Sequence, residues 1–433
     1  MKKLLTVYKT EFAAHYSVNR KMSFRNYVHS IVSRFLLFQT IQNVQSLNNG
    51  LALTPPMGWR TWNAYACNVN QTLLEKIMDL MVEPRSFGTE KNISLFQIGY
   101  KDVGLDDCWQ KCGAGYKGSF HTESGEPIVD EDKFPDLEQM VAYGHRKKLT
   151  VGWYGNNCVC SEHGFSSEEM NQQIEGDVNA TIKYKFDGIK LDGCGQKLNL
   201  EKYADLFGKY GHKVVIENCH WGNDLRTPFS CPYHFARTSQ DIVRTWEGFY
   251  LNLQTMARAN GLSGPGCWAY PDMLEVGNMN SSFFETRSHF GAWCITSSPL
   301  VLSFDLTNNK ILKAVWSIIT NKDAISVNQA WNGDAGRLLY SWDPKDETSQ
   351  DLPYYVWVLP CDDFEDEQQG WSLKRHGEEG ELRWTVEDVE SLRKVLKNKF
   401  KVKNIQDETD YETRNSGKHP FQSHFIYSRI LKK

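Results

Sequence analysis

Acidic residues follow several of the apolar, strand-like runs of this 433-residue chain. Asp106 and Asp107 close one run, Asp192 closes a second, and Asp241 and Asp272 follow two more. When parallel strands close into a barrel, their carboxyl ends meet at one mouth, where active sites are built. Two carboxylates on either side of a bond are the groups that hydrolyse glycosidic linkages. The pattern therefore predicts an acid-lined site that acts on sugars.

Asp192 is the candidate nucleophile of this site. Lys190 lies two residues earlier in the same strand-like run, so both side chains point toward one face of the sheet. A cation at this position favours the ionised form of Asp192, which is the form that attacks carbon. The competing interpretation is a purely structural ion pair between Lys190 and Asp192.

Asp241 is the candidate acid and base. It comes four residues after Arg237, in the loop that follows another strand-like run. The competing interpretation is that Asp241 only caps the next helix, since Asp is among the preferred N-cap residues.

Three further carboxylates have both a binding and a structural interpretation. Asp106 and Asp107 are adjacent like charges, and two buried carboxylates need partners. Sugar hydroxyls or Lys190 could provide them, or one of the pair could anchor a loop. Asp272 either binds a hydroxyl or caps the turn after Pro271.

The chain is rich in aromatic residues, with 14 Trp, 19 Tyr and 22 Phe making 13% of it. Sugars present flat C–H faces that pack on aromatic rings, although large cores use such rings too. Core packing is the better interpretation for any single ring. The rings near strand ends that could stack on a sugar are Trp59, Trp62, Tyr154, Trp221 and Trp268.

The elements that must position these residues alternate between strand and helix from about Leu51. Strands are expected at 57–65, 100–107, 149–154, 188–192, 213–218, 235–239, 266–268 and 300–304. Apolar residues at helical spacing predict helices between them, at 71–82, 137–147, 170–183, 200–210, 246–259 and 283–296. Eight such repeats in about 270 residues favour an α/β fold, the (β/α)₈ TIM barrel. A doubly wound open sheet is the rival, but no glycine-rich phosphate loop supports it.

Outside this barrel the composition of the chain changes. Residues 1–48 are expected to be a leader or a poorly ordered segment, in which the short apolar run 31–38 contains Arg34 and makes a poor signal sequence. The catalytic barrel is expected at 49–330. A short, partial C-terminal β-rich module is expected at 331–372, with strands at 337–342 and 354–359. A charged, divergent tail at 373–433 would hold one amphipathic helix at 386–397.

Cysteine usage points to an oxidising compartment. Ten of the 11 cysteines lie between Cys67 and Cys294, and none belongs to a zinc-ribbon or redox CxxC motif. Together with four glycosylation sequons, this predicts disulfide-bonded loops and a location outside the cell or in a lysosomal or vacuolar lumen. The sequons begin at Asn70, Asn92, Asn179 and Asn280.

The net charge and the hydropathy of the chain limit the kinds of partner to expect. A net charge of −4 gives no basic excess, so nucleic acid is not an expected partner. No apolar run reaches the ~18 residues that a membrane span needs. We expect a carbohydrate substrate, no membrane span, and a homodimer as the candidate assembly.

Several long motifs occur in a fixed order. They are Gly-Leu-Ala-Leu-Thr-Pro-Pro-Met-Gly-Trp-Arg-Thr-Trp-Asn at 50–63, Leu-Asp-Asp-Cys-Trp at 105–109, Lys-Leu-Asp-Gly-Cys at 190–194, Arg-Thr-Ser-Gln-Asp-Ile at 237–242 and Gly-Pro-Gly-Cys-Trp-Ala-Tyr-Pro-Asp-Met-Leu-Glu-Val-Gly-Asn at 264–278. Together they closely resemble glycoside hydrolase family 27, the α-galactosidases and α-N-acetylgalactosaminidases. The resemblance covers about residues 49–342.

The resemblance implies a retaining exo-glycosidase that removes terminal α-linked galactose by double displacement, with neither a metal nor a cofactor. Asp192 would be the nucleophile and Asp241 the acid/base. Two alternatives keep the fold and mechanism: an α-N-acetylgalactosaminidase and a β-L-arabinopyranosidase. A third is a non-catalytic sugar-binding homologue, against which the intact pair of Asp192 and Asp241 argues.

The resemblance also implies which residues would hold the sugar. Asp106 and Asp107 would bind the 4- and 6-hydroxyls of galactose, and Lys190 the 3- and 4-hydroxyls. The remaining contacts would be Trp62 packing on the sugar, Tyr154 lining the pocket near the nucleophile, and Arg237 at the 2-position with Asp272 near it.

Departures from the commoner family motifs fall at the sugar 2-position. Many members have Cys-Glu-Trp after the fifth strand, whereas this chain has Cys219, His220 and Trp221. His220 could donate to a 2-hydroxyl or an acetamido oxygen, or it could only shape the loop. Members often read Trp-Asn-Asp-Pro-Asp-Met where this chain has Ala269 and Tyr270. The preference between a 2-hydroxyl and a 2-acetamido group therefore stays open.

The family pattern implies two disulfides, Cys67–Cys108 and a bridge from Cys194 to Cys158 or Cys160. A Cys219–Cys231 bridge and a bridge from Cys112 are further inferences from the sequence.

Overall fold

The computed structural model describes residues 45–47, 49–87, 90–225, 230–259, 262–331, 335–342, 354–358, 364–366 and 371–373. The leader expected at 1–48 lies almost wholly outside the described residues. So does the tail at 373–433 with its expected helix at 386–397.

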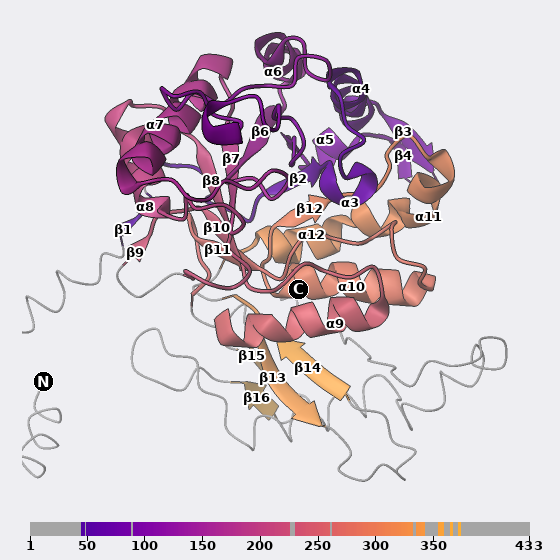
Figure 1. Ribbon diagram of the computed structural model, residues 1–433. Helices are drawn as coiled ribbons and strands as arrows, with labels where there is room; N and C mark the ends of the chain where they lie inside the picture. The colour runs from indigo at the N-terminus through magenta and orange to yellow at the C-terminus, as the bar shows by residue number, and fades with distance from the viewer. Residues whose placement is uncertain are drawn as a thin grey trace, which may run out of the picture. The chain divides into compact units, whose positions relative to one another are not determined.

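Eight parallel strands form one sheet, in the order β11-β10-β8-β7-β6-β5-β2-β12 (Figure 1). Their bounds are β2 (Met57–Arg60), β5 (Asp102–Gly104), β6 (Thr150–Gly155), β7 (Gly188–Asp192), β8 (Val215–Cys219), β10 (Phe235–Arg237), β11 (Trp268–Tyr270) and β12 (Leu300–Leu302). A parallel bridge between Leu274 and Leu302 joins the segment after β11 to β12, at the two ends of this order. The sheet is thus the strand layer of a (β/α)₈ barrel, as predicted.

The first strand is shorter than predicted, and this correction matters for the site. β2 ends at Arg60, and the expected remainder forms the short helix α3 (Trp62–Tyr65). The last ladder bond runs from the amide of Thr61 to the carbonyl of Gly104, and the amide of Tyr65 already bonds the carbonyl of Thr61. The chain therefore turns out of the sheet at Thr61, so Trp62 begins a helix just beyond the carboxyl end of β2.

Helices surround the strands (Figure 1). Their bounds are α4 (Gln71–Val82), α6 (Leu137–Arg146), α7 (Ser167–Tyr184), α8 (Leu200–Lys209), α9 (Trp246–Thr255) continued by the 3₁₀ turn η3 (Met256–Ala259), α10 (Phe283–Ile295), α11 (Asn309–Ile319) and α12 (Lys322–Gln329). Ser166 and Ser282 each form a capping box at the start of α7 and α10, which satisfies amide groups that the helix leaves free. α11 and α12 follow the eighth strand and were not predicted.

Smaller elements complete the described chain. They are β1 (Gln45–Ser46) paired with β9 (Ser230–Cys231), the hairpin β3 (Arg85–Phe87) and β4 (Glu90–Ile93), α5 (Leu95–Ile98) and the 3₁₀ turn η2 (Tyr116–Gly118). The antiparallel pairs β13 (Arg337–Trp342) with β14 (Tyr354–Val358) and β15 (Phe364–Asp366) with β16 (Trp371–Leu373) lie where the β-rich module is expected. Its boundaries stay a prediction.

The core explains two of the aromatic candidates. Trp59 is fully buried and its indole Nε1 donates to the carbonyl of Phe304. Trp268 is buried with Phe235 and Val301 in a separate cluster, and its Nε1 donates to the carbonyl of Ala52. Both rings pack in the core, where a buried indole needs a hydrogen-bond partner.

Four disulfides join described residues: Cys67–Cys108, Cys112–Cys160, Cys158–Cys194 and Cys231–Cys267. The Cys67–Cys108 bridge confirms the pairing implied by the family resemblance. The bridge expected from Cys112 goes to Cys160. Of the two partners considered for Cys194, the structure shows Cys158.

The predicted Cys219–Cys231 bridge is wrong. Cys219 ends β8 at the carboxyl edge of the barrel, whereas Cys231 and Cys267 precede the neighbouring strands β10 and β11 at the amino edge. The two pairing partners of the prediction therefore lie at opposite ends of the barrel. Cys219 is a buried free thiol, and burial raises its pKa well above the ordinary value.

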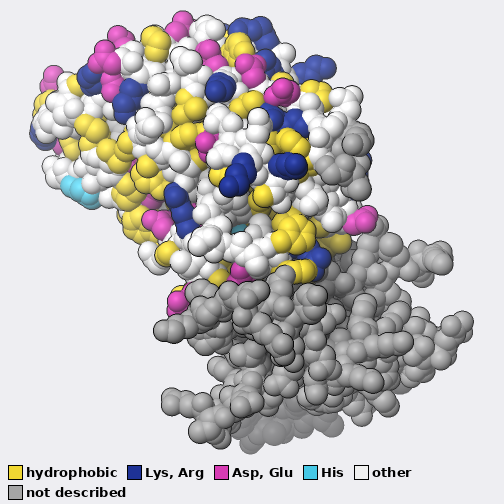
Figure 2. Space-filling model, turned by 90° about the vertical axis from the view of Figure 1, so that its right-hand side faces the viewer, with side chains coloured by type: hydrophobic (Ala, Val, Ile, Leu, Met, Phe, Trp, Pro, Cys, Tyr) yellow, Lys and Arg dark blue, Asp and Glu magenta, His cyan; other side chains and the backbone are white. Residues whose placement is uncertain are grey.

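The described surface mixes charges of both signs. Figure 2 shows basic and acidic side chains interspersed on the face it presents. Among the described helices, none is both long enough and apolar enough to cross a bilayer.

Candidate active site

The predicted acidic residues lie at the carboxyl edge of the sheet. Asp106 and Asp107 follow β5, and Asp192 is the last residue of β7. Asp241 follows β10, and Asp272 follows β11. Of the strands that carry them, β5 is separated from β7 by β6, and β10 from β7 by β8. The barrel thus gathers around one mouth residues that are spread over more than 160 positions of the chain.

Asp192 is held by two donors. The phenol of Tyr154 lies 2.7 Å from Oδ2, and the amide of Gly193 lies 2.7 Å from Oδ1. The side chain is almost fully buried, with 4% of the residue exposed. Burial, and then the charge of Asp192, raise the pKa of Tyr154 well above its ordinary value. Tyr154 therefore stays a phenol that donates to the carboxylate.

Lys190 pairs with Asp106, and not with Asp192. Its Nζ lies 2.9 Å from Oδ2 of Asp106 and 5.0 Å from the centre of the Tyr154 ring. Burial opposes the charge on Lys190, but Asp106 and neighbouring groups outweigh it and raise its pKa. The ion pair considered between Lys190 and Asp192 is thus not the one that forms. Lys190 instead pairs with Asp106, which thereby gains the partner that a buried carboxylate needs.

Groups of the protein itself satisfy the hydrogen-bonding capacity of the Asp107 carboxylate. Its two carboxylate oxygens accept hydrogen bonds from the amides of Cys108, Cys158 and Val159, and from the side chains of Gln110 and Asn157. Burial raises the pKa of Asp107, while these hydrogen bonds act in the opposite direction. The geometry is that of a loop anchor for 157–159, one of the two interpretations from the sequence.

Arg237 joins two carboxylates of the mouth. Its Nη2 lies 2.6 Å from Oδ1 of Asp241, and its Nη1 lies 3.4 Å from Oδ2 of Asp272. Asp241 exposes 77% of its side chain. The helix that follows is capped by Thr245, whose hydroxyl accepts from the amide of Gly248. Thr245, and not Asp241, is therefore the N-cap of α9.

Asp272 occupies an unusual backbone conformation. Its φ is +93°, which side-chain-bearing residues rarely adopt. Its Oδ2 accepts from the amide of Ile242 at 2.9 Å, which ties the loop carrying Asp241 to the loop after β11. Burial raises the pKa of Asp272, and Arg237 opposes this shift. Strain of this kind persists where surrounding contacts enforce it, often at functional sites.

His220 is buried and keeps one ring nitrogen without a described partner. Nδ1 lies 2.9 Å from a carboxylate oxygen of Asp224, and Nε2 has no hydrogen bond among the described residues. His220 follows Cys219, which lies opposite Asp192 in the strand register. The loop that it opens reaches the loop after β10, since Gln240 bonds the carbonyl of Trp221. Nε2 is thus a free polar atom between the strands of Asp192 and Arg237.

Of the remaining aromatic candidates, Trp62 and Trp221 are partly exposed. Trp62 packs against both described hydrophobic clusters, and Trp221 adopts a positive φ of +52°. Tyr154 is buried, and its hydroxyl donates to Asp192.

Asn156 and Asp224 were missed by the sequence-based predictions. Nδ2 of Asn156 donates to the carbonyl of Asp192 at 2.5 Å, and its Oδ1 accepts from the amide of Lys197. Asn156 therefore fixes the segment that follows Asp192. The sequence could have indicated Asn156, because it comes two residues after Tyr154, at the end of a predicted strand. Asp224 could be recognised only from the shape of its loop, which brings its carboxylate to His220.

Cys158, Asp192 and Cys194 lie close enough together to resemble metal ligands, with ligand atoms within 4.8 Å of one another. The two sulfurs form a disulfide, whereas a metal requires thiolates. The arrangement instead places a disulfide beside Asp192.

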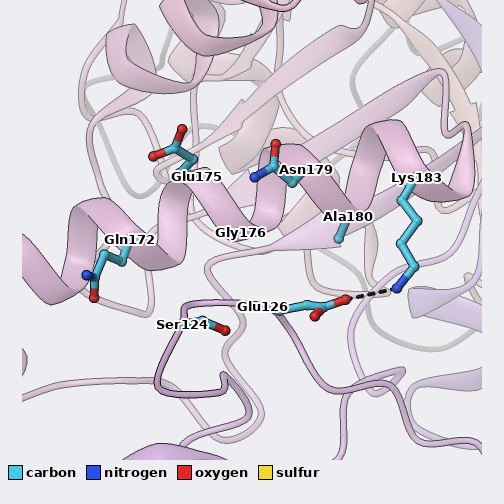
Figure 3. Close-up of a pocket in the computed structure, with 8 residues that line it drawn as sticks. All are labelled: Ser124, Glu126, Gln172, Glu175, Gly176, Asn179, Ala180 and Lys183. Carbon is cyan, nitrogen blue, oxygen red and sulfur yellow. Dashed lines mark hydrogen bonds and ion pairs between the residues drawn. The ribbon is translucent and has the colours of Figure 1, made fainter.

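A separate surface hollow of about 480 Å³ lies beside α7 (Figure 3). Glu126 and Lys183 form an ion pair across it at 2.9 Å. Its wall includes Asn179 of one sequon, whose glycosylation stays a prediction. The hollow contains none of the predicted site residues, and its wall is polar and lacks aromatic rings, so the strand-end cluster remains the candidate site.

Comparison with known proteins places the chain in a family. The family model described as Alpha galactosidase A matches residues 54–330. Alpha-galactosidase 3 of Arabidopsis thaliana is 31% identical over 301 residues, which cover 68% of this chain and 64% of that protein. This chain thus spans slightly less than two thirds of that relative's length.

Solved structures agree in fold. Alpha-galactosidase MEL1 from Saccharomyces cerevisiae superposes with a TM-score of 0.59 at 24% identity, covering 71% of this chain and 72% of MEL1. Alpha-galactosidase I from Mortierella vinacea gives a TM-score of 0.54 at 25% identity, covering 69% and 78%. With the match of the family model over 54–330, this chain belongs to glycoside hydrolase family 27, the family of α-galactosidase A.

Proposed function

We propose that this protein is a retaining exo-glycosidase that hydrolyses terminal α-linked galactose. The observation that carries the proposal is the cluster at the barrel mouth, in which Asp192 is held by Tyr154 while Lys190 is bound to Asp106. Membership of the family supports the substrate class.

The reaction takes two steps. Asp192 attacks the anomeric carbon while Asp241 gives its proton to the departing glycosidic oxygen, and a covalent galactosyl ester forms on Asp192. Asp241, now a carboxylate, takes a proton from water, which attacks the same carbon and releases Asp192. Two inversions leave the released galactose in the α-configuration.

The surroundings suit these roles. The phenol of Tyr154 and the amide of Gly193 orient the carboxylate of Asp192 for attack. Asp241 is exposed beside Arg237, where an incoming aglycone and water can reach it. Asp106 and Lys190 form a buried, charged pair that sugar hydroxyls can bridge.

Chemical rescue distinguishes the two catalytic roles. Asp192→Gly and Asp241→Gly should each lower turnover of an aryl α-galactoside by about 10²-fold or more. Azide should restore Asp192→Gly by forming β-galactosyl azide, and Asp241→Gly by forming α-galactosyl azide. Near-normal turnover by either variant, or the reverse azide products, would contradict the assignment.

The choice of sugar is tested by competing substrates. Aryl α-galactoside, α-N-acetylgalactosaminide and β-L-arabinopyranoside share the stereochemistry that this mechanism uses. We expect the highest kcat/KM for the galactoside. A higher value for either of the others would move the assignment to that sugar while the mechanism stands.

We also propose an oxidising location, either outside the cell or in a lysosomal or vacuolar lumen. Four disulfides among the described cysteines support it, because such bonds persist in oxidising compartments. A mass shift of the protein purified from its source after enzymatic removal of N-linked glycans would test it.

A further inference from the structure

Three loops above the barrel mouth meet at one guanidinium group. Arg244 lies three residues after Asp241, in the loop between β10 and α9. Its Nη2 donates to the carbonyl of Asn63, in the α3 turn that follows β2. Its Nε lies 3.9 Å from Oε2 of Glu275, in the segment after β11.

Each of these loops carries a residue of the candidate site. Trp62 precedes Asn63, Asp241 precedes Arg244, and Asp272 precedes Glu275 within the same loop. The contacts of Arg244 therefore connect the loop of the proposed acid/base, Asp241, with two loops whose residues Trp62 and Asp272 are expected near the sugar.

Glu275 is a buried partner for this cation. Only 1% of the residue is exposed, and Nδ2 of Asn63 donates to its Oε1 at 2.5 Å. Oε2 has no hydrogen bond among the described residues, so Arg244 is the cation that faces it. A buried carboxylate oxygen without a hydrogen bond is costly, which favours the approach of Arg244.

Asp241 itself has few constraints. Its side chain is 77% exposed, and Arg237 is its ion-pair partner. The neighbouring Ile242 amide bonds Asp272, and Arg244 provides the next attachment along the loop. In the chain, Asp241 thus lies between two arginines, Arg237 before it and Arg244 after it, each with contacts to other parts of the mouth.

We propose that Arg244 is a positioning residue for Asp241, which holds the loop of the acid/base against the α3 turn and Glu275. The proposal rests on the acid/base role of Asp241 in the proposed function. Arg244 exposes 57% of its side chain, so it can be replaced without opening the core.

The leaving group of the substrate provides the test. A phenyl α-galactoside needs a proton on its oxygen as the C1–O bond breaks, and Asp241 supplies it. An α-galactosyl fluoride releases fluoride with little help from a proton. A residue that acts through the acid should therefore matter for the first substrate and little for the second.

We expect Arg244→Gln to lower kcat/KM for the phenyl galactoside by about tenfold and for the fluoride by less than about twofold. Arg244→Lys, which keeps the charge, should restore part of the loss. Arg146→Gln, at an exposed arginine on α6, is the matched control and should change neither value. Equal losses on both substrates, or no loss on either, would overturn the proposal.

A second measurement stands apart from activity. Hydrogen exchange of the segment 238–246 should be faster in Arg244→Gln than in the wild type, and unchanged in Arg146→Gln. Unchanged protection of this segment in Arg244→Gln would overturn the positioning role. If the wild type hydrolyses neither substrate, the proposed function fails, and the exchange measurement still decides whether Arg244 holds the loop.

Discussion

The partners of each carboxylate distinguish residues of the same type at the mouth. Asp107 has five donors from the protein, Asp106 has the ammonium group of Lys190, and Asp241 is exposed beside Arg237. A carboxylate whose lone pairs are all occupied shapes a loop, whereas an exposed one can exchange protons with substrate and water.

Removal of the Tyr154 hydroxyl should act mainly through Asp192, which accepts the shorter of its two hydrogen bonds; the other, at 3.2 Å, is to Sγ of Cys158. Tyr154→Phe takes away the donor at 2.7 Å and leaves the ring. A hydrogen bond to a charged group is worth about 1.5–3 kcal/mol, so we expect kcat for an aryl α-galactoside to fall about tenfold or more. Steady-state kinetics with a melting curve check it, and a full-rate variant would show that the phenol does not orient the nucleophile.

His220 and Asp224 should act as a unit. If Asp224 fixes the ring through Nδ1, Asp224→Ala and His220→Ala should change the ratio of kcat/KM for galactoside over N-acetylgalactosaminide in the same direction, by about tenfold. Asp205→Ala, at an exposed carboxylate on α8, is the control. Opposite changes, or a change in one variant only, would separate the two residues.

The ends of the barrel strands are the elements that matter for the site. The candidate catalytic residues lie at the carboxyl edge, while the amino edge carries the Cys231–Cys267 bridge. The parallel register places Cys219 beside Asp192 and away from Cys231. This division of the two edges is general for (β/α)₈ barrels.

The disulfide pattern gives a prediction for these elements. Alkylation of the denatured, unreduced protein should label Cys219 and Cys294 among the ten cysteines between Cys67 and Cys294. Peptide mapping should then recover a Cys231–Cys267 link. Recovery of Cys219 joined to Cys231 would restore the pairing first expected from the sequence.

Stability of the whole molecule should depend on Glu275. Burial raises its pKa from 4.5 to about 7, so the folded protein keeps a proton that the unfolded chain releases. The contribution of Glu275 to the free energy of unfolding is complete below pH 4.5 and is lost as the pH rises from 4.5 to 7. The difference of about 2.5 units corresponds to about 3 kcal/mol.

The groups that face Glu275 are Asn63, Asn278, Arg244 and Asp272, with His289 accepting from its amide. Glu275→Gln should therefore flatten the fall in unfolding free energy between pH 5 and pH 8. Denaturant titrations at the two pH values check this. An equally steep fall in the variant would show that other groups control this range, such as Asp102, whose pKa desolvation raises to about 6.

The eight strands and their acidic ends were predictable from the residues, because each is local or repeats along the chain. The Cys67–Cys108 link was implied only by the resemblance to the family. The strand 188–192 was predicted with its observed bounds, whereas the strand expected at 57–65 ends at Arg60. The error arose because an apolar run does not show where a ladder of hydrogen bonds stops, which depends on the partner strand. The helices at 309–319 and 322–329 were not predicted, because no further barrel strand follows them to mark where a helix should lie.

The sequence by itself determined the family, the barrel and the residues available for catalysis, since these follow from residue type and order. Only the tertiary structure decided which charges pair. Lys190 pairs with Asp106 from 84 residues away, and Arg244 bonds Asn63 from 181 residues away. Such contacts depend on which strand ends become neighbours when the barrel closes. For the same reason the structure, and not the spacing of cysteines, separated Cys219 from Cys231.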